Sequence, residues 1–507
     1  AVLAIGWVGS GVILSDDPAE SVANQHDLSE ASVESAQSRP NVLVFVWDTA
    51  RADRMSLYGH PTQTTPWLDD WASNARVFNQ AVSPSFWTLP AHASLFTGTE
   101  VQTHGATWKH RWLDDEFTTM AEWFRDHGYA TFAWSTNPNV HSLRNTQQGF
   151  ETFLSPFDED EPWRERVLKA TENRLHPEDA STPVSPLWKG KPKKAPMIAG
   201  TVAKKALTEW IDGGGTQDKP FFAFVNLMEV HDPRLPTDTN RSVVFDEERS
   251  YKRSLTLNAS PGRMRKATTQ RQPYSEAQRE VLTGVYDATL MDLDRSTQRI
   301  MKELEKRGGL DNTIVLLTSD HGEAFGEHGY YRHNRGLHEE MVRVPLVLWY
   351  PARVDGERVD EPVTTAAAFG ALCALAGLPI PETPGFIGSG LPVNPSGVVV
   401  ADGRLPVGDR KKKDPERMWE NLMAIYVDGW KLIEGDQSTH ELYRLDQDPF
   451  ERHNLHAEKP DVVKDLGGQL AAWKQSTPER SSAGPPTVSD REDKEMEGLL
   501  QTLGYIE

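Results

Sequence analysis

Apolar runs that end in polar turns set the pattern of this chain. Residues 41–47 and residues 314–317 are apolar stretches of strand length, and each is followed by acidic and turn-forming residues. Continuous runs, as opposed to alternating ones, are typical of parallel strands that are buried on both faces. Residues 275–307 instead repeat their apolar side chains at helical spacing. This mixture predicts an α/β fold in which helices flank a large, mostly parallel sheet.

The same pattern predicts how the chain is divided. Residues 1–39 begin apolar and then turn polar without a period, which is typical of the end of a signal peptide or membrane anchor followed by a linker. We therefore expect export to the periplasm, the exterior or a membrane surface. Residues 40–395 are expected to form the main domain, with insertions near 157–195 and 234–272. The second insertion is placed as a lid, and a solvated loop is the alternative. Residues 396–507 are expected to form a smaller α+β subdomain and a tail.

Shorter apolar stretches predict further elements. Residues 366–376 surround the one cysteine, Cys373, and indicate a packed helix. A single cysteine forms no intramolecular disulfide, so cysteine usage does not indicate the compartment. The final region predicts strands near 421–426, 429–433 and 441–445 and a helix from 458 to about 474.

Acidic residues directly follow two of the predicted strands. Asp48 follows residues 41–47, while Asp320 and His321 follow residues 314–317 after Thr318 and Ser319. Open α/β sheets bind their ligands at the carboxyl ends of such strands. Two carboxylates and an imidazole suit a divalent cation, and this set does not distinguish calcium, manganese, magnesium and zinc. Each segment alone also fits a polar turn or helix cap, so the hypothesis depends on their convergence.

A hydroxyl at a helix start is the third candidate feature. Thr88 and Pro90 precede a short helical run that ends at Gly98. The amides and the dipole at a helix N-terminus favour an anion. A hydroxyl beside a cation at such a position can ionise and attack phosphorus or sulfur. An ordinary threonine near a helix start is the alternative.

These segments together resemble the sulfatase branch of the alkaline phosphatase superfamily, from about residue 39 to residue 475. Thr88-Leu-Pro-Ala-His92 stands where sulfatases carry Cys/Ser-x-Pro-x-Arg. The resemblance implies an alkaline phosphatase-like sandwich, a C-terminal α+β subdomain and a divalent metal on Asp48, Thr88, Asp320 and His321. The other matching stretches are residues 40–53, 221–233, 320–329, 342–346, 430–433, 441–449 and 451–455.

One departure from the family pattern bears on the chemistry. Sulfatases oxidise the Cys or Ser of this motif to an aldehyde, whereas the extra methyl group of Thr88 would leave a ketone. Cys373 lies in its own apolar stretch and offers no substitute. A threonine that attacks directly is what the family's phosphodiesterase and phosphoethanolamine-transferase members use. We therefore expect Thr88 to act as the nucleophile itself.

The resemblance also implies contacts to the substrate. His231 follows a strand as the family's substrate-contacting histidine does, and His333 lies twelve positions after His321, where relatives carry Lys or His. His92 replaces the motif arginine and offers fewer donors and a charge that varies with pH. Asn137 is a candidate hydrogen-bond donor to the substrate. Supporting roles are expected for Glu323 and His328.

Composition limits the partners. The chain has 507 residues, a net charge of −20 and an isoelectric point near 5.3, which argues against nucleic acid as a main partner. The expected substrate is a small-molecule, glycan or lipid ester that meets a metal-neutralised pocket, and the N-terminus could tether the protein to a membrane.

The sequence therefore predicts a metal-dependent hydrolase of phosphoric, or alternatively sulfuric, esters with a phospho-threonine intermediate on Thr88. His231 and His333 would stabilise the non-bridging oxygens or protonate the leaving alcohol, and together they would also permit zinc or a second metal. Transfer of the group to a sugar or lipid acceptor is a second hypothesis. A non-catalytic, ester-binding relative is a third.

Overall fold

The computed structural model describes residues 39–156, 163, 165–167, 200–232, 234–244, 273–333, 335–387, 399–406 and 419–480. The expected leader and most of both expected insertions lie outside these ranges. The chain separates into two units, residues 1–39 and residues 40–507, and the described helices and strands all belong to the second.

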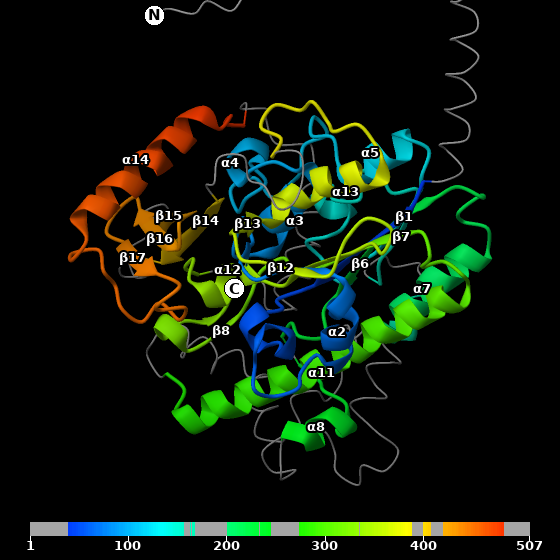
Figure 1. Cartoon of the computed structure of the whole chain (residues 1–507), viewed down its shortest axis with the longest axis horizontal. Helices are drawn as coiled ribbons and strands as arrows, with labels where there is room; N and C mark the ends of the chain where they lie inside the picture. The colour runs from blue at the N-terminus through cyan, green and yellow to red at the C-terminus, as the bar shows by residue number, and fades with distance from the viewer. Residues whose placement is uncertain are drawn as a thin grey trace, which may run out of the picture. The chain divides into compact units, whose positions relative to one another are not determined.

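An eight-stranded sheet with the order β12-β2-β11-β7-β1-β6-β4-β5 forms the centre of this unit (Figure 1). All neighbouring strands are parallel except β11, which runs antiparallel to both β2 and β7. The large, mostly parallel sheet is therefore as predicted. Its strands are β1 (Asn41–Trp47), β2 (Arg76–Phe78), β4 (Ala130–Trp134), β5 (Thr152–Leu154), β6 (Phe221–Leu227), β7 (Thr313–Thr318), β11 (Leu346–Trp349) and β12 (Glu357–Val359).

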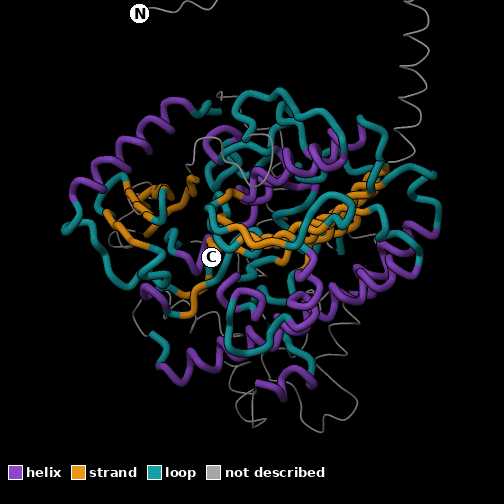
Figure 2. Tube along the Cα trace, viewed as in Figure 1, coloured by secondary structure: helices purple, strands orange, loops and turns teal. Residues whose placement is uncertain are grey.

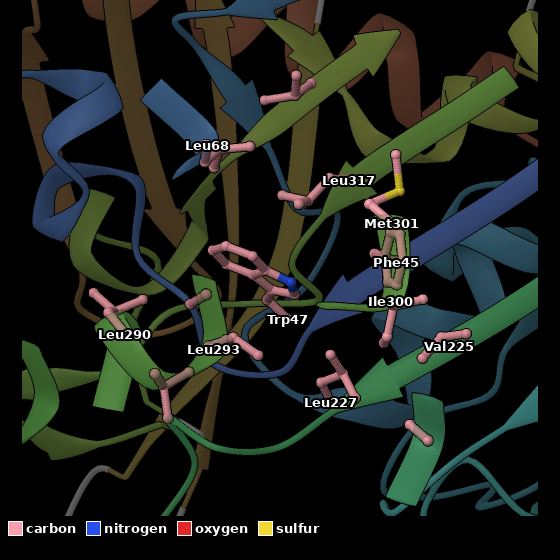
Figure 3. Packing of buried hydrophobic residues seen from close by; sticks show 14 of the residues in the cluster. Phe45, Trp47, Leu68, Val225, Leu227, Leu290, Leu293, Ile300, Met301 and Leu317 are labelled. Atoms are coloured by element: carbon pink, nitrogen blue, oxygen red, sulfur yellow. The ribbon is translucent and has the colours of Figure 1, made fainter. Parts of the chain in front are cut away.

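Helices cover both faces of this sheet. On one face, α3 (Thr88–Thr97), α5 (Met120–Asp126) and α13 (Ala368–Ala376) pack against Val42, Val44 and Val46 of β1. On the other face, α2 (Pro66–Trp71), α7 (Gly200–Asp212) and α11 (Glu276–Lys306) pack against Leu43, Phe45 and Trp47. Figure 3 shows Phe45 and Trp47 beside Leu290, Leu293, Ile300 and Met301 of α11. Burial on both faces explains the unbroken apolar run of β1.

The long helix α11 begins and ends close to the predicted residues 275–307. Ser275 and Gln278 form a capping box at its start, which satisfies two exposed backbone donors. α13 is likewise the predicted apolar helix, and Cys373 within it is buried. Among the described helices, none has both the length and the apolar character that crossing a bilayer requires.

A four-stranded antiparallel sheet follows near the C-terminus, drawn apart from the main sheet in Figure 2. The strands are β14 (Val399–Pro406), β15 (Trp419–Val427), β16 (Trp430–Gly435) and β17 (His440–Arg444). Helix α14 (Pro460–Ser476) packs on them through Leu466 and Leu470. Three strands and the helix match the prediction, whereas β14 was not predicted.

Smaller elements complete the described chain. Residues 234–244, the start of the expected lid, contain α8 (Asp238–Val244), and the carboxylate of Asp292 on α11 accepts hydrogen bonds from Thr237 and Asn240. This part of the segment is therefore fastened to α11. The remaining elements are α4 (Val101–His104), α12 (Glu339–Val342), β3 (Ala81–Val82), β8 (Ala324–Phe325), β9 (Tyr331–Arg332), β10 (Arg343–Val344) and β13 (Val363–Thr364).

Candidate active site

The ends of β1 and β7 bring three candidate metal ligands together. Val46 pairs with Thr318, so the two parallel strands end at the same edge of the sheet. Asp48, Asp320 and His321 follow directly, and one ligand atom from each lies within 4.8 Å of the others. All three side chains are buried, with at most 4% of any residue exposed. The convergence that the sequence predicted is therefore present.

Hydrogen bonds orient the two carboxylates and leave one oxygen of each unused. Oδ1 of Asp320 accepts from the backbone amides of Thr49 at 3.0 Å and His321 at 2.9 Å. Oδ2 of Asp48 accepts from Asn137 Nδ2 at 2.6 Å. Asp48 Oδ1 and Asp320 Oδ2 are buried without a hydrogen-bond partner among the described residues. Buried carboxylate oxygens without donors fit a bound cation.

The tautomer of His321 fits the same role. Its Nδ1 lies 2.9 Å from the carbonyl oxygen of Gly322, and a neutral ring that donates there carries its lone pair on Nε2. Nε2 lies 3.3 Å from Asp320 Oδ2. The ring therefore presents a ligand atom to the same point as the carboxylates.

Electrostatics also favour a cation at this point. Burial, and next the charge of Asp320, raises the pKa of Asp48 to about 8. Burial raises the pKa of Asp320 to about 7, against the lowering effect of its backbone donors. Two carboxylates that resist ionisation without a counter-charge are stabilised as anions by a divalent cation. The residues present thus fit the metal that the resemblance implies.

Thr88 lies beside this group as the first residue of α3. Its Oγ1 is 3.4 Å from His321 Nε2 and 3.3 Å from Asn137 Nδ2. Trp87 before it is extended, Pro90 fits the first turn, and Gly98 ends the helix at a φ of 64°. The hydroxyl is therefore at a helix N-terminus and within reach of the candidate ligands.

Asn226 belongs to this group, although its sequence pattern did not single it out. It lies on β6, and its Nδ2 is 3.4 Å from Asp48 Oδ2. Its Oδ1 is buried and accepts no hydrogen bond from the described chain. An amide oxygen in this position could complete a cation's coordination. The available signal was a polar residue inside an otherwise apolar strand.

His92 lies against the backbone of α3, the helix that begins at Thr88. Its Nδ1 is 2.9 Å from the carbonyl oxygen of Thr88 and 3.7 Å from Asp320 Oδ2, and its ring packs edge-on against Phe96 and Phe224. Complete burial lowers its pKa to about 3, so the imidazole is neutral at physiological pH. This position therefore provides no fixed positive charge where sulfatases carry arginine.

The two other histidines lie at the same edge of the sheet. The His333 ring centroid is 4.7 Å from that of His321 and 5.1 Å from that of His231. Burial, and next the nearby His333, lowers the pKa of His231 to about 3. The structure thus brings together all the site residues that the sequence predicted.

A buried ionic network supports this edge. Glu323 Oε2 lies 3.3 Å from His333 Nδ1 and accepts from Arg234 at 2.9 Å. Arg234 also donates to Asp232 and to the carbonyl oxygen of Val230. Glu323 was expected to have a supporting role, but Arg234 was overlooked because it begins a polar segment that was predicted only as a lid or a solvated loop.

His328 has a different position from the active-site histidines. It stacks on His338 with the ring centroids 3.6 Å apart, and its Nδ1 is 2.9 Å from Glu340. Its Nε2 lies 2.9 Å from the carbonyl oxygen of Glu451. These contacts link α12 to the C-terminal region.

A mostly parallel sheet with a hydroxyl, two carboxylates and an imidazole at its edge is the arrangement expected of a sulfatase-type ester hydrolase. The family model described as Sulfatase matches residues 40–378, and this chain belongs to the sulfatase family.

Curated relatives agree with this assignment. The ulvan-active sulfatase of Formosa agariphila is 26% identical over 355 residues, which cover 68% of this chain and 63% of that protein. The uncharacterized sulfatase YidJ of Escherichia coli is 26% identical, with 82% and 83% of the two chains covered. An N-acetylglucosamine-6-O-sulfatase of Bacteroides thetaiotaomicron is 22% identical, with 87% and 88% covered.

Solved structures share the fold. The phosphonate monoester hydrolase of Agrobacterium radiobacter has a TM-score of 0.63 at 23% identity and covers 86% of this chain and 96% of its own. The structure of BT4656 with its substrate D-glucosamine-2-N,6-O-disulfate has a TM-score of 0.62 at 20% identity, with 89% and 100% covered.

Proposed function

We propose that this protein is a metal-dependent hydrolase of phosphoric or phosphonic esters in which Thr88 is the nucleophile. The observation that carries the proposal is the position of Thr88 Oγ1, 3.4 Å from His321 Nε2 at the start of a helix. Esters carried by a glycan or a small molecule are the proposed substrates, since the names of several sulfatase relatives refer to sugars.

Asp48, Asp320 and His321 would hold the cation, with Asn226 Oδ1 as a further ligand. A divalent cation bound there would neutralise charge on an ester oxygen and lower the pKa of a nearby hydroxyl. Thr88 and the side-chain amide of Asn137, which lie side by side at the start of α3, would orient the ester against the cation.

The covalent steps use residues of this chain alone. Thr88 Oγ1 forms a bond to phosphorus while the bond from phosphorus to the leaving oxygen breaks in line. The neutral ring of His231 or His333 accepts the proton of the Thr88 hydroxyl and passes it to the leaving alkoxide, and the same ring later carries a proton from water back to Thr88 Oγ1. The water oxygen then bonds to phosphorus, the bond to Thr88 Oγ1 breaks, and the free phosphate or phosphonate is released.

Phosphorus is favoured over sulfur by the identity of residue 88. Oxidation of a threonine side chain cannot give the aldehyde of sulfatases, and Cys373 is buried in α13, where burial raises the pKa of its thiol to about 12. Sulfuric ester hydrolysis is the second candidate, because the named curated relatives are sulfatases.

A substrate panel tests the proposal. Purified protein is assayed with para-nitrophenyl phosphodiester, phosphonate, phosphate and sulfate substrates, with and without an acceptor alcohol. We expect turnover of phosphorus esters that EDTA removes and that Thr88→Ala lowers at least about 10⁴-fold, while Thr88→Ser keeps part of it. Turnover of the sulfate alone, or full activity of Thr88→Ala, would contradict the proposal.

A further inference from the structure

A second set of metal-ligand residues lies in the C-terminal sheet and has no part in the proposed reaction. Glu434 on β16 and His440 on β17 face each other as a cross-strand pair, and His456 follows in the next loop. The Glu434 carboxylate lies between the two rings, 3.0 Å from His440 Nδ1 through one oxygen and 3.7 Å from His456 Nε2 through the other. These side chains are 27%, 46% and 30% exposed, so solvent ions reach them.

The strand pair that carries two of these side chains is held rigidly. Between Glu434 and His440 the chain turns, and the carboxylate of Glu420 accepts hydrogen bonds from the backbone amides of Gln437 and Thr439 at 3.0 and 2.7 Å. It also accepts from the hydroxyl of Thr439 at 2.8 Å. Glu434 and His440 therefore start from fixed backbone positions.

The loop that carries His456 is fixed as well. Oδ1 of Asn454 accepts from the amides of Leu442 at 3.0 Å and His456 at 2.9 Å. Its Nδ2 donates to the carbonyl oxygen of His440 at 3.2 Å. One asparagine thus ties the His456 loop to the strand of His440. This arrangement lowers the entropy that a bound ion would otherwise have to remove.

The geometry suits a small borderline cation. One ligand atom from each residue lies within 4.8 Å of the others, so a point exists within about 2.8 Å of all three. Small rotations of exposed side chains would bring each atom to the roughly 2.0–2.2 Å of zinc coordination. Two imidazoles and one carboxylate favour zinc over calcium or magnesium.

The other cluster of this composition lacks that geometry. His328 and His338 lie in parallel planes, 6° apart, with ring centroids separated by 3.6 Å. One ion cannot lie in both ring planes at bonding distance. Each ring also contacts its own carboxylate, Glu340 at 2.9 Å and Glu441 at 2.8 Å. His328 and His338 are therefore held by ion pairs. The rings of His440 and His456 are instead inclined to each other by 29°, with centroids 5.5 Å apart, so their planes are not parallel.

We propose that Glu434, His440 and His456 bind one zinc-class divalent cation that joins the β16–β17 hairpin to the following loop. The ion takes the place of the direct contact between His440 Nδ1 and Glu434 Oε2. Water completes the coordination, because the site is open to solvent. Binding of the ion to the folded state alone stabilises the subdomain by mass action.

Zinc titration of the full chain tests this proposal. Equilibrium dialysis with Zn²⁺ and metal analysis would count the ions per chain in wild type, His440→Ala and His456→Ala. We expect each variant to bind one ion fewer, with affinity at this site reduced at least about 100-fold, since loss of outer ligand partners alone costs about 10–100-fold. At zinc concentrations that fill this site, wild type should gain more melting temperature than His440→Ala or His456→Ala, which retain only the candidate cation site at Asp48, Asp320 and His321.

His453→Ala is the matched control, because His453 lies in the same loop, is 76% exposed and is 3.8 Å from Glu458. It should keep the wild-type zinc count. An equal count in wild type, His440→Ala and His456→Ala would overturn the proposal, as would an equal loss in His453→Ala. Phosphoester turnover should be the same in all four proteins, so failure of the zinc site is distinguishable from failure of the proposed reaction.

Discussion

One methyl group on Thr88 separates this chain from sulfatases that form an aldehyde. Its side chain still has the two properties that a nucleophile needs here, a hydroxyl 3.4 Å from His321 Nε2 and a place in the first turn of α3. His92 is a second difference, because its buried neutral ring stands where sulfatases carry a permanently charged arginine. In the proposed reaction, a site with fewer fixed positive charges would depend more strongly on a bound cation to neutralise the ester.

Asp48 gives a pH-dependent prediction for the metal-free protein. Its pKa is raised from 3.8 to about 8, so the unfolded state releases this proton first and stability falls as pH rises from about 4 to about 8. In EDTA, Asp48→Asn should therefore melt higher than wild type at pH 8 and nearly equally at pH 4. The measurement is thermal unfolding at both pH values.

The same variant should lose the benefit of the metal. Added divalent cation should raise the melting temperature of wild type and have a smaller effect on Asp48→Asn. If EDTA-treated wild type were as stable at pH 8 as Asp48→Asn, burial would not raise the pKa of Asp48 as this prediction requires.

At the scale of elements, strongly patterned segments were predictable and partner-dependent ones were not. β1, β7 and α11 have enough consecutive or periodic apolar residues to specify their type. β14 contains Asp402-Gly-Arg404, and its conformation comes from pairing with β15. The convergence of Asp48 with Asp320 followed from parallel strands ending at one edge.

Other site residues could not be found from local pattern. Asn226 and Arg234 lie in segments whose local pattern indicates only a core strand and a solvated loop. Their roles depend on neighbours far along the chain, Asp48 for Asn226 and Glu323 for Arg234. A single sequence contains no signal for such pairings beyond an unexpected polar residue.

The loop after β7 gives a kinetic prediction. Glu323 holds His333 through Nδ1, so Glu323→Gln should disturb proton transfer by that ring. We expect kcat to fall about 100-fold, at the lower end of what general acid–base catalysis supplies. The loss should be greater for alkyl than for para-nitrophenyl leaving groups, because the better leaving group needs less protonation.

Asp294→Asn is a suitable control for that experiment. Asp294 is also a buried carboxylate, but it accepts from the amides of Trp67 and Leu68 at the start of α2. Its replacement should lower stability by about 0.5–2 kcal/mol and leave the leaving-group dependence unchanged. A Glu323→Gln enzyme with the same loss for both leaving groups would show that Glu323 only stabilises the fold.

At the scale of the whole described unit, a buried cation joins the C-terminal sheet to the catalytic part. Lys431 on β16 is fully buried, and its Nζ lies 2.9 Å from Glu339 on α12 and 2.7 Å from Glu451. Lys431→Met would leave two carboxylates without their cation and should cost about 3–5 kcal/mol in the free energy of unfolding.

Chemical denaturation measures this cost, and a triple variant provides the control. Lys431→Met combined with Glu339→Gln and Glu451→Gln removes the charges together and should recover most of the loss. A single Lys431→Met variant as stable as wild type would mean that solvent reaches these carboxylates in solution.

The proposed reaction depends on a covalent bond between substrate and Thr88. Protein mixed with a slowly hydrolysed phosphodiester or phosphonate ester is quenched in acid, digested and analysed by high-resolution mass spectrometry. We expect a phosphoryl or phosphonyl adduct on Thr88. The adduct should be absent from Thr88→Ala and should disappear once the substrate is consumed. Rapid turnover with an unmodified Thr88, or an adduct on another residue, would contradict this mechanism.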